Sequence, residues 1–184
     1  MARTPKKLAH ALASTALAAA YTVPASTRTQ VTEIWIENND TQVTKNVTIT
    51  AGRLVFKDSL ANMINVPAKE TVVISKTNII LTASETIGIY VDAAVTGTAQ
   101  TGAATTITLA AGSSATDNYY TGSVIELTND TPTGVIGLSK KITAYVGSTK
   151  VATVDSAWST NPTGSTTYQI GPLYVTLFGI EESV

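Results

Sequence analysis

The sequence lacks most of the residues that enzymatic and metal sites use. Its 184 residues include no cysteine and one histidine, His10. The missing cysteine excludes a disulfide scaffold, a thiolate metal site and a cysteine nucleophile. His10 lies in a basic leader, so the rest of the chain has no histidine for a Ser-His-Asp triad or a histidine metal cluster.

Charge and aromatic residues are also scarce. Charged residues make up 14% of the chain and aromatic residues 6%, whereas soluble domains typically have about 25% charged residues. The formal net charge is −1, so the basic footprint of a nucleic-acid-binding protein is missing. No apolar run reaches the roughly 18 residues of a transmembrane helix. We therefore expect neither nucleic acid nor a membrane as a partner.

The chain is rich in residues that favour strands. Thr, Val and Ile together supply 65 residues, and these β-branched side chains fit a pleated sheet. Residues 29–39, TQVTEIWIENN, alternate with period two. This places Val31, Glu33, Trp35 and Glu37 on one face and Thr32, Ile34, Ile36 and Asn38 on the other.

Similar short runs recur along the chain, separated by turn residues such as Asn38-Asn39-Asp40 and Ala51-Gly52. Short strands at 8 to 12 residue spacing predict an all-β fold, either a sandwich or a barrel. Of the two we expect an antiparallel β-sandwich. The one helical alternative after residue 20 is a short turn at Asp58–Met63.

The domain plan depends on the last strand. Residues 95–105 are a Thr/Gly/Ala-rich stretch that we interpret as a linker, and further short strands follow it. Residues 172–181 then resume strict alternation and need a sheet to join. We expect a module at 98–171, inserted before the last strand of a sandwich made of 21–97 and 172–184. Two tandem domains are the alternative.

The first 20 residues form a basic, Ala-rich leader containing Arg3, Lys6 and Lys7. Its outline resembles a secretory signal, but the apolar part is weak because His10, Ser14 and Thr15 interrupt it. A solvated tail is a second interpretation. We expect an N-terminal arm at 1–20 that is buried against another subunit through Arg3, Lys6 and Lys7.

Catalytic and cofactor motifs do not occur in the sequence. It contains no G-x-S-x-G elbow, Walker loop or G-x-G-x-x-G. The carboxylates Asp117, Glu126, Asp130 and Asp155 lack the spacing of a calcium loop. We therefore predict no catalytic residues, no cofactor and no metal.

Four aromatic residues are candidate contacts to a partner or a glycan: Trp35, Tyr119, Tyr120 and Trp158. The adjacent tyrosines could form a sugar-stacking edge. The competing interpretation is structural, with one tyrosine packed inward and Trp158 in the core of the small module. The sparse charge of the polar faces is typical of the core of a protein interface, so we expect a component of an assembly and a homo-oligomer.

Two stretches carry a resemblance to a known family. YTVPASTRTQVTEIWIENND, VTITAGRLVFKD, KETVVIS and the closing VTLFGIEE together resemble a β-sandwich domain of tailed-bacteriophage structural proteins. The segment from Thr106 to Ile170 is similar to a small β module of phage tail-fibre and virion-surface proteins, through Tyr120, Gly122, Trp158 and Thr167–Ile170.

The resemblance implies a non-enzymatic virion protein, located at the head-tail neck or collar or on the capsid surface as a decoration protein. Its partners would be capsid, portal, neck or tail proteins. A tail-fibre or baseplate component and a carbohydrate-binding adhesin module are the alternatives.

Overall fold

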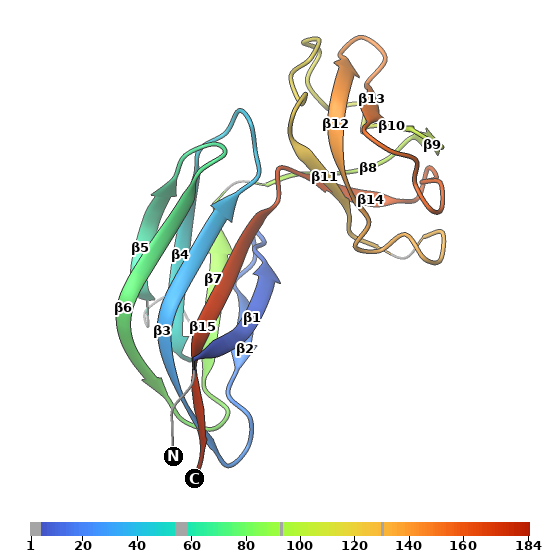
Figure 1. Ribbon diagram of the computed structural model, residues 1–184. Helices are drawn as coiled ribbons and strands as arrows, with labels where there is room; N and C mark the ends of the chain where they lie inside the picture. Colours follow the sequence, from blue (N-terminus) through green and yellow to red (C-terminus); the bar gives the residue numbers. More distant parts are fainter. Residues whose placement is uncertain (1–4, 54–58, 93, 130) are drawn as a thin grey trace. The chain divides into compact units, whose positions relative to one another are not determined.

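The computed structural model describes residues 5–53, 59–92, 94–129 and 131–184 (Figure 1). Every sheet in it is antiparallel, and the described residues contain no helix. The prediction of an all-β, antiparallel fold is therefore confirmed.

The chain divides into two compact units. The sandwich unit comprises Met1–Asn38, Thr44–Ala93 and Leu173–Val184, and the small unit comprises Asn39–Val43 and Ala94–Pro172. The small unit therefore begins at residue 94, where the sequence pattern predicted 98. It also includes Asn39–Val43, a short segment between the third and fourth strands of the chain, which the sequence pattern did not indicate.

The sandwich unit consists of two four-stranded sheets, which appear as two layers in Figure 1. The first sheet has the order β1 (Lys6–Leu12), β15 (Leu173–Ser183), β3 (Thr27–Asn38) and β6 (Thr71–Leu81). The second sheet has the order β2 (Ala18–Thr22), β7 (Thr86–Val91), β4 (Lys45–Gly52) and β5 (Ser59–Val66). The last strand thus joins the middle of the first sheet.

Aliphatic side chains from both sheets form the sandwich core. From the first sheet come Val31, Ile34, Ile36, Val175 and Leu177, and from the second Val47, Ile49, Ile87, Ile89 and Val91. All of them are at most 2% exposed. The β-branched residues of the sequence are therefore concentrated where two pleated surfaces meet.

A β-bulge in β3 changes the expected alternation. In the pairing of β3 with β15, Val31 and Glu33 lie opposite the consecutive residues Gly179 and Phe178, so β3 contains one extra residue, and an extra residue in a ladder reverses the side-chain phase. Ile34 and Ile36 are buried and Trp35 is exposed, as the alternation predicts. Val31 was expected on the side of Trp35, and that expectation is wrong because the bulge turns Val31 into the core.

The leader is part of the sandwich, so the expectation of a separate arm at 1–20 is wrong for its described residues. β1 pairs along β15 from Lys6↔Gly179 to Leu12↔Tyr174, and β2 pairs with β7. Without β1, β15 would be an edge strand with its hydrogen-bonding groups open. The leader closes that edge within its own chain.

Residues 59–66 also differ from expectation. They form β5, which pairs with β4 from Lys45↔Val66 to Thr50↔Ser59, so the alternative of a short helical turn at Asp58–Met63 does not hold for residues 59–63. Asp58 lies outside the described residues. The neighbouring strand β4 overrides a weak local preference in this stretch.

The small unit contains one seven-stranded sheet. Its order is β8 (Val95–Thr98), β14 (Thr167–Ile170), β11 (Val124–Leu127), β12 (Ser139–Val146), β13 (Val151–Val154), β10 (Thr106–Thr108) and β9 (Thr101–Ala103). Residues 95–105 were expected to be a linker, but they supply β8 and β9. Their Thr-rich composition fits strands that pair at the two edges of this sheet.

Candidate functional site

The outward side of the first sandwich sheet carries a group of exposed and partly buried aromatic residues. Strand register brings residues from three strands together, with His10 opposite Thr176 and Thr176 opposite Trp35. Tyr174 and Phe178 lie two residues to either side of Thr176 on β15, so they point to the same face. We call this set, His10, Trp35, Tyr174 and Phe178, the aromatic face.

Trp35 is the most prominent member of the aromatic face. It is 44% exposed, and its indole Nε1 donates a hydrogen bond to Glu33 Oε2 at 3.0 Å. The Trp35 and Phe178 rings lie 5.5 Å apart at 58°, a tilted geometry that aromatic pairs favour. These two contacts hold the indole in place while leaving much of its surface open to a partner.

His10 and Tyr174 form the other half of the aromatic face. Their rings stack at 4.8 Å with an interplanar angle of 15°. His10 Nδ1 and the Thr176 hydroxyl form a hydrogen bond of 2.8 Å. The imidazole is therefore held by both neighbours on β15.

A shallow hollow adjoins the aromatic face. Its lining residues are Pro5, Thr32, Glu33, Ser75 and Phe178. It thus offers an apolar ring, a carboxylate and hydroxyl groups within one depression. Such a mixture suits recognition of a protein surface or of a polar ligand with an apolar side.

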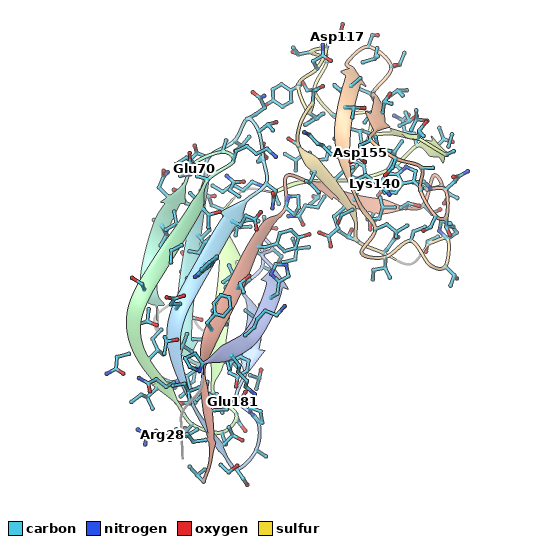
Figure 2. The ribbon with its side chains drawn as sticks, in the orientation of Figure 1. Arg28, Glu70, Asp117, Lys140, Asp155 and Glu181 are labelled. Atoms are coloured by element: carbon cyan, nitrogen blue, oxygen red, sulfur yellow. The ribbon has the colours of Figure 1, made fainter. Side chains whose placement is uncertain are left out.

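A polar cluster joins the two sandwich sheets near the C-terminal end of β15, where Figure 2 labels Glu181. Glu181 accepts hydrogen bonds from the Lys6 ammonium and, at 2.5 Å, from the Tyr21 hydroxyl. The Tyr21 oxygen also forms a 2.9 Å hydrogen bond with the Thr29 hydroxyl. Because Tyr21 has one proton and gives it to Glu181, Thr29 is the donor in that pair.

The pKa values in this cluster reflect these bonds. The hydrogen bond from Lys6, followed by that from Tyr21, lowers the pKa of Glu181 below its ordinary value. Burial, followed by the hydrogen bond to Glu181, raises the pKa of Tyr21 to about 12. At neutral pH the carboxylate therefore stays charged and the phenol stays neutral, which preserves the cluster.

The three basic residues assigned to an inter-subunit arm have different locations. Lys6 pairs with Glu181 of its own chain, and Lys7 is exposed on β1. Arg3 lies outside the described residues. Lys6 therefore has an intramolecular partner, and its contact to another subunit stays a prediction.

The structure separates the aromatic candidates of the small unit. Tyr119 is 38% exposed, whereas Tyr120 is 6% and Trp158 is 5% exposed, and both of these belong to the core. Their rings cannot stack on a glycan from within that core. Only Tyr119 remains as an accessible aromatic contact among these three.

A hydrogen bond and a ring contact hold the buried Tyr120 side chain in place. Its hydroxyl accepts from the Ser114 backbone N–H at 3.1 Å, and its ring meets Tyr145 edge-on at 4.8 Å. Burial, followed by the electrostatic effect of the neighbouring Tyr120, raises the pKa of Tyr145 to about 12. This tyrosine pair is therefore a structural part of the small unit.

The acidic residues of the small unit also have structural contacts. Asp117 Oδ1 accepts a hydrogen bond from the Gly147 N–H at 2.8 Å, and Asp155 accepts one from Ser156. Asp130 lies outside the described residues. Within the described part of the chain, no three His, Cys, Asp or Glu side chains come together as a metal site would require.

The sequence analysis identified one member of the aromatic face, Trp35. The signal for two others was present, because residues 172–181 alternate strictly and place Tyr174 and Phe178 on one side of a strand. What joins them to Trp35 and His10 is strand order, which connects residues more than 130 positions apart.

Comparisons with known proteins return no relatives. No family model matches the chain, and neither a curated protein nor a solved structure is significantly similar to it. No helix long and apolar enough to cross a membrane occurs among the described residues.

Proposed function

We propose that the chain is a non-enzymatic virion structural protein of a tailed bacteriophage. In this proposal it assembles at the head-tail neck or collar, or on the capsid surface as a decoration protein. The observation that carries the proposal is the aromatic face, in which the exposed Trp35 and His10 lie beside the partly buried Tyr174 and Phe178 on one sheet. Exposed patches of this kind mark interaction surfaces, and aromatic residues are enriched at interfaces.

Two further features support an assembly role. Charged residues make up only 14% of the chain, and low charge favours the core of an interface over a solvated surface. The two strand segments that resemble phage sandwich domains, around Trp35 and around Phe178, are adjacent in the first sheet.

Incorporation into particles tests the proposal. Phage lacking the gene would be complemented with the wild-type chain, with Trp35→Ser and with Tyr119→Ser as a matched control in the small unit. We expect purified particles to contain the wild-type and Tyr119→Ser chains and to lose most of the Trp35→Ser chain. Absence of the wild-type chain from particles would overturn the proposal, and its position would follow from cryo-EM.

A carbohydrate-binding module is the second candidate function. It is favoured by one observation, that the exposed Trp35 ring lies beside a carboxylate, Glu33, which gives a stacking surface next to a hydrogen-bond acceptor. Glycan-array binding that disappears in Trp35→Ser and survives in Tyr119→Ser would favour this candidate. Tyr120→Ala does not suit this test, because the Tyr120 side chain is in the core.

A further inference from the structure

β6 is an edge strand with few of the features that protect sheet edges. It lies at one end of the first sandwich sheet, and its 11 residues, TVVISKTNIIL, contain one charged residue and no proline. Natural proteins usually protect edges with lysines, prolines, bulges or short strands. The opposite edge follows that rule, since β1 carries Lys6 and Lys7.

A regular segment covers the first half of β6. Its pairing with β3 runs without a shift from Thr71↔Glu37 to Ser75↔Glu33, and the irregularity begins after Ser75. Val73 lies at the centre of this segment and is 48% exposed. Thr71–Ser75 is therefore a flat, accessible stretch of edge.

One hydrogen bond fixes which backbone groups face outward. The Asn38 N–H donates to the Glu70 carbonyl at 3.0 Å, which makes these two residues a hydrogen-bonded pair. Such pairs alternate in an antiparallel ladder, so Val72 and Ile74 direct their N–H and C=O groups toward β3. The N–H and C=O groups of Thr71, Val73 and Ser75 consequently point to the open edge.

We propose that β6 pairs antiparallel with β6 of a second copy of this chain, about a two-fold axis at Val73. The inference deepens the proposed function, on which its biological meaning rests, by naming one partner in the assembly. It would join two four-stranded sheets into one continuous eight-stranded sheet. A strand that pairs antiparallel with its own copy satisfies the self-complementarity of a two-fold interface.

The sequence of the segment is self-complementary in this register. Val73 lies opposite its own copy, Val72 opposite Ile74, and Thr71 opposite Ser75, so like chemistry meets at every pair. Val72 and Ile74 are only partly buried against the core, and pairing would cover them further.

The partner's aromatic face would lie close by. Trp35 is next to Val73 across the β3–β6 pair, so the two Val73 residues would connect two aromatic faces into one apolar stripe. A second copy of the chain would therefore extend both the backbone hydrogen bonds of the sheet and the apolar surface that its exposed side chains form.

A charge-exchange experiment on the full chain tests the register. Sedimentation velocity over a concentration series would compare the wild type, Val73→Lys, Val73→Glu and an equimolar mixture of the two variants. Like charges opposite each other should weaken the dimer at least about tenfold in each variant, and the mixture should restore it. Val146→Lys, at an exposed valine of the small unit, is the matched control and should dimerise like the wild type.

Each other result counts against the proposal. A wild-type chain that stays monomeric at every concentration overturns it, as does a Val73→Lys chain that dimerises normally or a mixture that stays monomeric. Circular dichroism would verify that the variants are folded. If the charge exchange works but particles lack the chain, the proposed function fails while the dimer stands.

A single cysteine gives a second readout. The chain has no cysteine of its own, and Cα atoms of a hydrogen-bonded antiparallel pair lie about 5.5 Å apart, within disulfide range. Val73→Cys should therefore form a disulfide-linked dimer under mild oxidation much faster than Val146→Cys. Equal rates for the two variants would contradict the register.

Discussion

Glu181 shows how one residue can connect much of the sandwich unit. Its carboxylate accepts from Lys6 on β1 and from Tyr21 on β2, and Tyr21 bonds in turn to Thr29 on β3. The cluster thereby joins strands of both sheets. Lys6 thereby links the first strand to β15.

The lowered pKa of Glu181 predicts a pH-dependent contribution to stability. A carboxylate whose pKa is lowered by folding contributes stability above its unfolded pKa, and that contribution is lost as the pH falls through the folded pKa. Glu181→Gln should therefore lower the free energy of unfolding by about 1 kcal/mol at pH 7. The difference from the wild type should shrink on acidification.

Urea unfolding at neutral and acidic pH would measure this difference. Glu37→Gln, at an exposed glutamate on β3, is the control and should leave the unfolding free energy unchanged. A Glu181→Gln deficit that stays constant or grows toward acid pH would contradict the assignment of the pKa shift to Lys6 and Tyr21.

Burial of aromatic residues could be predicted only in part. The sequence identified Trp35 as outward-facing because its neighbours Ile34 and Ile36 alternate with it, and the structure agrees. No such pattern surrounds Tyr119 and Tyr120, which lie in a turn region. Tyr120 is buried because its side chain contacts Ser114 and Tyr145. Turns separate both of these residues from Tyr120 in the sequence, so no local pattern indicates the contacts.

At the scale of elements, β1 was the strand that was hardest to predict from the sequence. Its residues, KKLAHAL, are basic and Ala-rich, and Ala and Lys are poor strand formers. The strand exists because β15 offers an unpaired edge, to which β1 adds. Tertiary pairing here overrides local propensity.

Hydrogen exchange on the isolated chain would test the placement of β1. The amides of β1 that bond to β15 should exchange at least about tenfold more slowly than in a synthetic peptide of residues 5–13, because ladder hydrogen bonds protect them. Mass spectrometry of peptic fragments gives the comparison. Rates equal to those of the peptide would show that the leader is a loose tail.

The bulge in β3 shows where the period-two alternation of a strand no longer predicts which face is buried. Alternation correctly assigned the faces of Ile34, Trp35 and Ile36, but it failed at Val31, beyond the bulge. An inserted residue leaves no signal in hydrophobic alternation until the partner strand is known. Strand faces are therefore predictable from sequence between bulges and ambiguous across them.

At the scale of the whole molecule, the small unit occupies a loop of the sandwich unit. The Val91 N–H donates to the Ser14 carbonyl, and the Ala13 N–H donates to the Leu173 carbonyl. Since Ala13 and Ser14 are consecutive, the end of β7 and the start of β15 lie beside the same turn. The chain leaves and re-enters the sandwich at one place.

Deleting the small unit should leave a folded sandwich. Every residue of the sandwich core lies outside 94–172, and closing a short loop costs little. A variant that joins Asp92 to Leu173 through a short Gly-Ser linker should show a β-rich circular dichroism spectrum and one cooperative thermal transition. The same variant carrying Ile36→Asp is the unfolded control.

The outcome that contradicts this prediction is a deletion variant indistinguishable from its Ile36→Asp control. Such a result would mean that the sandwich needs the small unit to fold. The isolated small unit, which has its own core around Ile107, Ile125, Ile142 and Trp158, should also unfold cooperatively.

The sequence by itself determined the fold class and the inward faces of most strands, because β-branched composition and alternation are local properties that any sheet must satisfy. It also indicated that the last strand belongs with the first ones. Tertiary structure alone decided the order of strands, and with it the aromatic face, the Glu181 cluster and the open edge at β6. These features join residues far apart in the chain, and no local pattern specifies which edge a given strand will join.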